Sequence, residues 1–244
     1  MTRFVILAVP RTGSNLLCTL LNSHPQILCH HEVFNPQGIF TALDYRGQGL
    51  TVESLRQRDD DPLRFLDRVW QTAADETCVG FKWTRGQNEE VLKSVLKDDQ
   101  VKKIVLRRRN RIKTYVSERI AQETKQWEVY SRDELTMPRP RIHVDAGELL
   151  QHIASNQRFY AEVSAAIDES SQPHLQLEYE TLFDPKIQKR MFEFLAVGAP
   201  QTPPVAASVK QNSNDLQDSI ANFAELAARL PEGEFTAELF DRGI

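Results

Sequence analysis

Hydrophobic and polar residues come in blocks along the chain, and these blocks predict strands and helices in alternation. Five short apolar runs have the length and composition of strands, at residues 3–9, 27–29, 78–83, 102–107 and 174–179. The first run, RFVILAV, is almost continuously apolar. That pattern is typical of a strand buried on both faces of a parallel sheet.

Segments with the period of an amphipathic helix lie between and after these runs. They cover residues 16–22, 62–73, 89–97, 111–122, 145–168, 185–195 and 220–230. Asn88, Asn110 and Asp145 stand where helix N-caps are expected, and Pro62 suits a first helical position. The alternation predicts an α/β fold, a doubly wound parallel sheet flanked by helices in three α/β/α layers. We expect a single domain over residues 1–244.

Two segments follow neither pattern. Residues 125–144 are polar and contain Pro138 and Pro140, which predicts a mobile loop over a site. Residues 199–218 contain three prolines followed by VKQNSN, which predicts an ordered surface loop or a lid.

Composition and net charge limit the classes of binding partner and the cellular location that we expect. The net charge of −4 disfavours a general nucleic-acid binder, which would be basic, so we expect no nucleic-acid partner. Cys18, Cys29 and Cys78 lack metal-ligand spacing and suggest buried free thiols in a reducing compartment. The sequence shows neither the pattern of a secretory signal nor an apolar run of membrane length. We therefore expect a cytoplasmic protein without a membrane span.

The stretch PRTGSNLL, residues 10–17, carries the first candidate chemistry, because it joins a strand to a helix through a short turn. Backbone amides near Thr12–Leu16 and the helix dipole favour an anion there. Side-chain donors and a charge come from Arg11, Thr12, Ser14 and Asn15, and Gly13 allows the tight turn. The Gly-Lys-Ser/Thr end used for ATP or GTP is missing. The alternative is a plain turn with a capping Ser or Thr.

A second candidate is VLRRRNRIKTYVSERI, residues 105–120. A predicted strand ends in Arg107–Arg109, and Ser117 follows about two turns into the next helix. The carboxyl end of a strand is where open α/β sheets bind ligands, so this cluster suits a second anion. The alternatives are a solvated basic face and a nucleic-acid patch. A third segment, LEYETLFDPKIQKRMFEFLAVG at 177–198, shows by itself only a strand, a turn and an amphipathic helix.

Together these three segments resemble the sulfotransferase family. PRTGSNLL is similar to the family's 5′-phosphosulfate loop, with Arg11 where many members have lysine. The spacing from Arg109 to Ser117 resembles the 3′-phosphate segment, and YETLFDP is similar to the signature Tyr-Glu-x-Leu-x-x-Asp-Pro. The resemblance implies the P-loop-like sulfotransferase fold and a donor, 3′-phosphoadenosine 5′-phosphosulfate (PAPS), that becomes PAP. It also implies that no metal is needed.

The resemblance also assigns roles. The loop from Arg11 to Leu16 would hold the bridging phosphate and the sulfuryl group, with Arg11 stabilising the leaving-group charge. Arg109 and Ser117 would bind the 3′-phosphate. Lys210 would cover that phosphate, and Tyr179 would lie near the adenine. Lys82, at the end of a predicted strand, would hold the acceptor or the sulfuryl oxygens.

The residue expected to act as general base differs from that of many family members. Many eukaryotic members have a histidine where this sequence has Thr84. The stretch CHHEVFNP resembles HPQEYF-type segments of bacterial carbohydrate sulfotransferases of the trehalose or nodulation type, in which a glutamate is the base. Glu32 is therefore the candidate base, and we expect burial to raise its pKa. A surface or structural carboxylate is the alternative, with His30 and His31 as rival bases.

The leading hypothesis is an enzyme that transfers the sulfuryl group of PAPS in line to a hydroxyl of a carbohydrate or glycolipid-like acceptor. Candidate acceptor-binding residues are His30, His31, Phe34 and Trp127. A homodimer is compatible with the sequence. Three alternatives stay open: a P-loop nucleotide or small-molecule kinase, a non-catalytic PAP-binding protein, and a nucleic-acid module that uses RRRNRIK. The missing Gly-Lys-Ser/Thr argues against the kinase.

Overall fold

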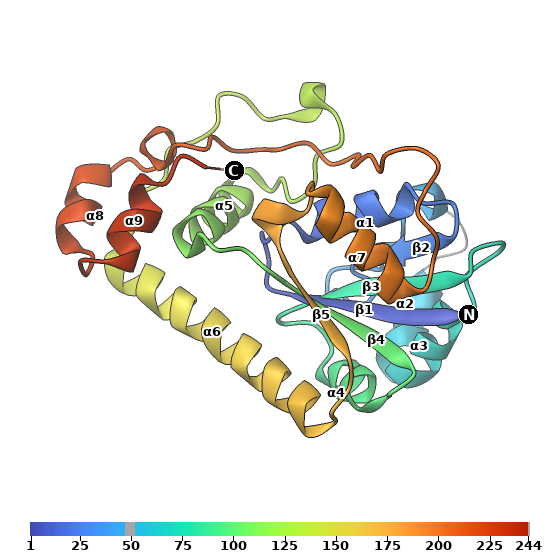
Figure 1. The fold of residues 1–244 in the computed structure, drawn as a ribbon. Helices are drawn as coiled ribbons and strands as arrows, with labels where there is room; N and C mark the ends of the chain where they lie inside the picture. The colour runs from blue at the N-terminus through green and yellow to red at the C-terminus, as the bar shows by residue number, and fades with distance from the viewer. Residues whose placement is uncertain (47–51, 244) are drawn as a thin grey trace.

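The structure is a computed structural model that describes residues 1–46 and 52–243. Strands in these residues form one parallel sheet: β1 (Thr2–Ala8), β2 (Ile27–His30), β3 (Cys78–Thr84), β4 (Val101–Arg107) and β5 (His174–Glu178). The order β2-β3-β1-β4-β5 puts β1 at the centre (Figure 1). Parallel strands end at one edge of the sheet, so the segments that follow β1, β2, β3 and β4 meet there.

The helices lie where the sequence pattern changes period. The longer ones are α1 (Ser14–Asn22), α2 (Val52–Asp60), α3 (Pro62–Trp70), α4 (Glu89–Lys97), α5 (Arg111–Thr124), α6 (Ala146–Glu169) and α7 (Pro185–Leu195), and two short ones follow, α8 (Phe223–Arg229) and α9 (Glu234–Phe240). The side chains of Asn88, Asn110 and Asp145 accept hydrogen bonds from the first turns of α4, α5 and α6. The predicted caps are thereby confirmed.

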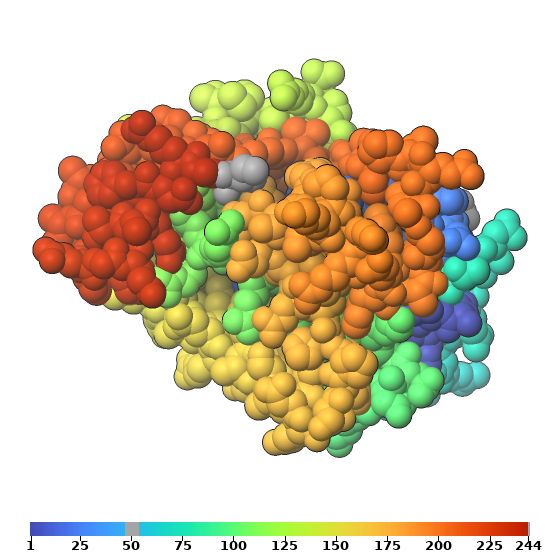
Figure 2. Space-filling model, in the orientation of Figure 1, coloured from blue at the N-terminus to red at the C-terminus, as the bar shows by residue number. Residues whose placement is uncertain are grey.

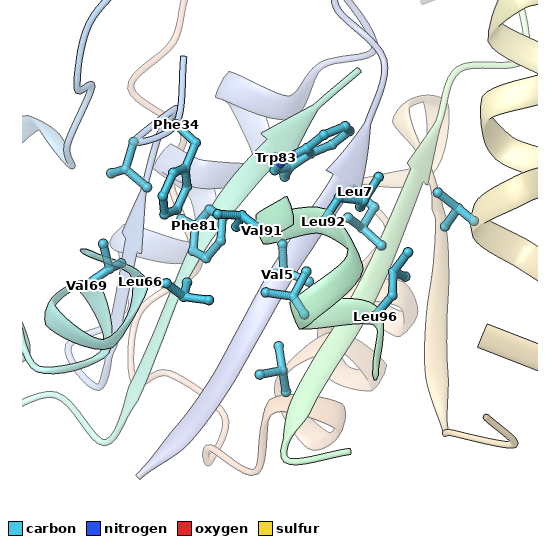
Figure 3. Packing of buried hydrophobic residues seen from close by; sticks show 14 of the residues in the cluster. Val5, Leu7, Phe34, Leu66, Val69, Phe81, Trp83, Val91, Leu92 and Leu96 are labelled. Carbon is cyan, nitrogen blue, oxygen red and sulfur yellow. The ribbon is translucent and has the colours of Figure 1, made fainter. Parts of the chain in front are cut away.

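Alternate residues of the buried strands pack on opposite faces of the sheet. Val5, Leu7 and Phe81 point to the face covered by α3, α4 and α6 (Figure 3). Phe4 and Ile6 point to the face covered by α1 and α7. A third apolar cluster joins α5 and α6 to α8 and α9. The predicted fold class, a parallel sheet between two helical layers, is confirmed.

The sequence pattern did not predict α2 and α9, and the helices predicted at 62–73 and 220–230 are longer than the observed α3 and α8. The sequence of α2, VESLRQRDD, is mostly polar, and α9 is only seven residues long, so neither has a clear apolar stripe. The helix predicted at 220–230 is α8, at Phe223–Arg229. Ile220 is excluded from it because it forms a β-bridge with Ile142.

The two irregular segments lie side by side across the top of the molecule in Figures 1 and 2. The backbone N–H of Val209 donates to the carbonyl of Val129 at 2.8 Å. Arg139 Nη2 donates to Asn212 Oδ1 at 3.1 Å. Hydrogen bonds therefore connect segments 125–144 and 199–218. No helix in the described part of the chain is long and apolar enough to span a bilayer.

Candidate active site

The turn after β1 has a backbone that only certain residues tolerate. Arg11 and Gly13 have φ angles of 65° and 86°. A Cβ added to Gly13 would lie 2.2 Å from Cδ2 of Tyr179, so the ring leaves room for glycine alone. The hydroxyl of Thr12 donates to the carbonyl of Val9 at 2.8 Å. The turn is thus fixed by its own chemistry before α1 begins at Ser14.

A cleft of about 920 Å³ opens at the carboxyl edge of the sheet beside this turn. Residues expected at the site from the sequence that line it are Arg11, Gly13, Ser14, Asn15, Leu16, Glu32, Lys82, Ser117, Trp127, Tyr179 and Lys210. Residues expected there that do not line it are Thr12, His30, His31, Phe34 and Arg109. The fold therefore brings most of the predicted site together from seven separate segments.

Arg11 ties the turn to three other parts of the chain. Its Nε donates to Ser117 Oγ at 2.9 Å, and its Nη1 donates to the carbonyl of Trp127 at 2.5 Å. Its Nη2 donates to Gln211 Oε1 at 3.2 Å. Burial and the charges of Arg108 and Arg139 lower the pKa of Arg11 to about 10. The guanidinium thus carries its charge at neutral pH among other cations.

Arg108 is a second cation of the cleft, and no individual role for this residue was predicted from the sequence. Its guanidinium carbon lies 4.8 Å from the centre of the Tyr179 ring, and its buried Nε has no hydrogen-bond partner among the described residues. Burial lowers the pKa of Arg108. The pKa of Lys210 is also lowered, first by burial and then by the charges of Arg108 and Lys113.

Within the described residues, no carboxylate pairs with Arg11, Arg108 or Lys210. Burial lowers the pKa of both Arg11 and Arg108, and placing such cations side by side without a paired carboxylate is costly unless an anion joins them. The hydroxyls of Ser14 and Ser117 add donors to the same cleft. The donor set fits a ligand with several phosphate or sulfate groups.

Arg109 lies elsewhere. Its Nε is 3.2 Å from Glu178 Oε2 and 3.7 Å from Glu180 Oε2, and its side chain is 62% exposed. Arg108 and Arg109 follow β4, which ends at Arg107, and only the side chain of Arg108 lines the cleft. The motif spacing selected Arg109, whereas the side chain in the cleft is that of Arg108.

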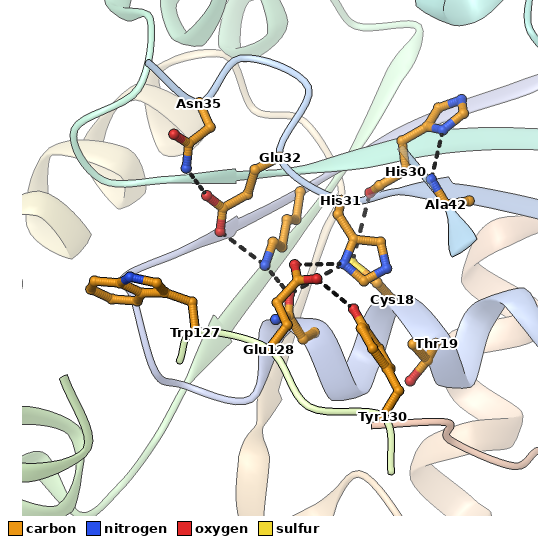
Figure 4. Close-up of polar contacts among 12 residues, drawn as sticks. Cys18, Thr19, His30, His31, Glu32, Asn35, Ala42, Trp127, Glu128 and Tyr130 are labelled. Carbon is orange, nitrogen blue, oxygen red and sulfur yellow. Dashed lines mark hydrogen bonds and ion pairs between the residues drawn. The ribbon is translucent and has the colours of Figure 1, made fainter. Parts of the chain in front are cut away.

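A carboxylate–lysine pair forms the other charged group of the cleft (Figure 4). Lys82 Nζ lies 2.9 Å from Glu32 Oε1, and Lys82 also donates to Asn15 Oδ1. Asn35 Nδ2 donates to Glu32 Oε2 at 2.5 Å. Burial raises the pKa of Glu32, but the charge and hydrogen bond of Lys82, with the hydrogen bond of Asn35, outweigh it and leave the pKa below its ordinary value. The expected rise in the Glu32 pKa was therefore wrong, because burial was considered without Lys82.

His30 and Phe34 are parts of the core. His30 Nε2 lies 2.8 Å from Thr72 Oγ1, and its Nδ1 accepts from the backbone N–H of Ala42 at 3.2 Å. Burial, together with the neighbouring His31, lowers the pKa of His30 to about 4. Phe34 packs edge-on against Phe65. Neither residue reaches the cleft.

Glu128 is a cleft residue that sequence reasoning missed. Its carboxylate accepts from Arg46 at 2.5 Å and from Tyr130 Oη at 2.8 Å. It also lies 3.5 Å from His31 Nδ1. Burial raises the pKa of Glu128, but His31, Arg46 and Lys82 hold it well below the ordinary range. A single glutamate in an irregular segment gives no pattern from which this position could be found.

Comparison with known proteins identifies the family. No family model matches the chain. Nodulation protein H of Rhizobium tropici is 30% identical over 243 residues, covering 98% of this chain and 92% of that protein. Nodulation protein H of Rhizobium meliloti (strain 1021) is 27% identical over 239 residues, covering 95% and 92%. The chain therefore belongs to the sulfotransferases, in the family of nodulation protein H.

Solved structures of sulfotransferases are also similar along nearly the whole chain. The sulfotransferase from Alicyclobacillus acidocaldarius is 15% identical with a TM-score of 0.42, covering 98% of this chain and 96% of that one. The sulfotransferase domain from the curacin biosynthetic pathway is 13% identical with a TM-score of 0.46, at the same coverage. The family assignment rests on the nodulation protein H relatives.

Proposed function

We propose that this sulfotransferase uses PAPS as donor and a hydroxyl of a carbohydrate or glycolipid-like molecule as acceptor, with Glu32 as general base. The observation that carries the proposal is that one cleft holds both a cation cluster and the ion pair Glu32–Lys82. The cation cluster consists of Arg11, Arg108 and Lys210, none of which forms an ion pair with a carboxylate of the described residues. Bound PAPS supplies an activated sulfuryl group, whose transfer to the acceptor releases PAP.

The cation cluster is suited to hold the donor. The amides of residues 12–16 and the N-terminus of α1 favour an anion at the turn, where Arg11 would offset charge on the leaving oxygen. Ser117 and Lys210 would bind the 3′-phosphate, joined by an arginine from the end of β4. Arg108 is the arginine that we favour, because it already lies in the cleft. Tyr179, beside Gly13 and Arg108, would contact the adenine.

Glu32 is suited to take the acceptor proton. A carboxylate has about four lone-pair positions, and here one donor occupies each oxygen, so a hydroxyl can still be accepted. Lys82 keeps Glu32 ionised at neutral pH, which the role of a base requires. Glu128 is less suited, because Arg46 and Tyr130 already bind one oxygen and His31 faces the other.

The acceptor class is supported by the side chains around Glu32. Amides of Asn35 and Gln37 and the aromatic rings of Phe40 and Trp127 line the same cleft. Amides can bond to the hydroxyls of a sugar, and flat rings can pack against its apolar face. This lining therefore suits a sugar better than an entirely apolar acceptor. The resemblance of CHHEVFNP to bacterial carbohydrate sulfotransferases supports the same class.

The test is transfer of radioactive sulfate from PAPS to a panel of mono- and oligosaccharides, for the wild type and for Glu32→Gln. We expect a labelled sugar ester with the wild type and a loss of turnover of about 100-fold or more in the variant, with PAP affinity kept. The matched control is Glu123→Gln, because Glu123 is exposed at the end of α5. Full turnover by Glu32→Gln would remove Glu32 from the mechanism, and ester formation on phenols alone would remove the sugar class.

A further inference from the structure

His31 stands between two acceptors. It is fully buried, with Nδ1 at 3.3 Å from Asn15 Oδ1 and 3.5 Å from Glu128 Oε1. The Asn15 atom is the oxygen, because the same atom accepts from the ammonium of Lys82, which can only donate. A ring nitrogen that faces a carbonyl oxygen and a carboxylate must carry a proton. Nε2 has no partner within the described residues, so His31 is set as the neutral Nδ1–H tautomer.

Glu128 is held so that one of its oxygens is left for His31. Arg46 and Tyr130 both donate to Oε2, and the Arg46 guanidinium lies 5.2 Å from the centre of the Tyr130 ring. Oε1 faces His31. Figure 4 shows the carboxylate between His31 and Tyr130. Its segment is seated by two neighbouring contacts, from Arg11 to the Trp127 carbonyl and from Val209 to the Val129 carbonyl.

The tautomer of His31 fixes the amide of Asn15. Two donors, the ammonium of Lys82 and the Nδ1–H of His31, converge on Asn15 Oδ1. A flipped amide would place its NH₂ against both donors. Nδ2 is therefore the Asn15 atom left to bind a ligand in the cleft that Asn15 lines. The chain of contacts then continues from Lys82 to Glu32.

We propose that Glu128 is a positioning residue, which sets the tautomer of His31 and through it the orientation of Asn15 and Lys82. Its effect on turnover rests on the proposed function, whereas its effect on His31 does not. Glu128 lies on segment 125–144, whereas Asn15 lies on α1 and Lys82 on β3. The position of segment 125–144 therefore determines how Asn15 and Lys82 are oriented in the cleft. Under the proposed function, Lys82 and Asn15 would contact ligand directly, because both line the cleft, whereas Glu128 would act through His31.

The first test needs no substrate. Long-range ¹H–¹⁵N correlation spectra of the full chain, labelled with ¹⁵N in histidine, distinguish the two neutral tautomers of His31. The wild type should show Nδ1–H. In Glu128→Gln, the amide oxygen should turn to Arg46 and Tyr130, which puts the NH₂ against His31 Nδ1 and switches the ring to Nε2–H. Glu123→Gln should leave the Nδ1–H form unchanged. An Nε2–H ring in the wild type, or the same tautomer in Glu128→Gln, would overturn the proposal.

The second test measures turnover and donor affinity separately. We expect Glu128→Gln to lower kcat by about 10- to 100-fold, as a small misplacement of reacting groups does, with PAP affinity within about twofold of the wild type. A loss confined to PAP affinity, or an unchanged kcat, would contradict a positioning role. A wild type that transfers no sulfate from PAPS refutes the proposed function instead, and the tautomer spectra then decide the role of Glu128 alone.

Discussion

The ammonium of Lys82 lies 2.9 Å from the Oε1 of Glu32, and the Lys82 side chain is only 3% exposed. Burial disfavours both charges, but each partner outweighs that penalty for the other, so the pKa of Lys82 is raised and that of Glu32 is lowered. Removing one partner of a buried pair leaves an uncompensated charge. The pair therefore rests in its charged form, with Glu32 ready to accept a proton.

This relationship predicts how the pKa of Glu32 responds to Lys82. In the wild type, carboxyl ¹³C shifts followed against pH should titrate below 4.5, the ordinary value. In Lys82→Met, burial acts without its counter-charge, so the pKa should rise above 4.5. A Glu32 titration that is the same in both proteins would contradict the pair.

The same pair predicts the sign of a stability change with pH. Because the folded pKa of Glu32 lies below its unfolded value, its contribution to the free energy of unfolding is present above pH 4.5 and is lost as pH falls through the folded pKa. Urea unfolding at a series of pH values should show this loss in the wild type. In Lys82→Met the sign should reverse, since a raised folded pKa favours the protonated, folded form at low pH.

Arg108 and Arg109 make a matched pair for the 3′-phosphate site. Arg108→Ala should weaken PAP binding by about 10-fold or more, because it removes from the cleft a guanidinium whose Nε is buried without a partner among the described residues. Arg109→Ala removes ion pairs that an exposed side chain makes with Glu178 and Glu180, and it should change PAP affinity by less than about threefold. Calorimetry with PAP and with ADP measures both. The reverse order would mean that Arg109 leaves its carboxylates when the donor binds, as its motif position implies.

Two glycines test the turn. Gly13→Ala puts a Cβ 2.2 Å from the Tyr179 ring at a φ of 86°, so both crowding and backbone strain apply. We expect a loss of about 2–4 kcal/mol in the free energy of unfolding and weaker PAP binding. Gly86→Ala, at a φ of 96° with open space around it, should cost about 1 kcal/mol. Equal losses in urea unfolding would show that the Tyr179 contact does not constrain the turn.

The fold could be predicted from the sequence because the patterns that specify it are local. The apolar run of β1, the caps Asn88, Asn110 and Asp145, and the alternation of periods each act over a few residues, and together they specify a parallel sheet between helices. The polar α2 was missed for the same reason, since no local stripe marks it.

Residues of the site could be predicted from the sequence only where a motif marks them. PRTGSNLL and YETLFDP led to the turn at Gly13 and to Tyr179, which the fold brings into contact. Glu128 reaches His31 from nearly a hundred residues away, and no spacing rule covers that distance. The pKa of Glu32 was predicted in the wrong direction because the direction of its shift depends on Lys82, which lies far along the chain on β3.

We propose that the cation cluster binds the 3′-phosphate of a PAPS-type nucleotide. Isothermal titration of PAP, with ADP, AMP and ATP–Mg²⁺ as comparators, tests it most directly. We predict that PAP binds at least about 10-fold more tightly than ADP, a difference of about 1.4 kcal/mol that reports the 3′-phosphate. Binding of ATP–Mg²⁺ without binding of PAP would contradict the account and point to a kinase-like use of the same turn.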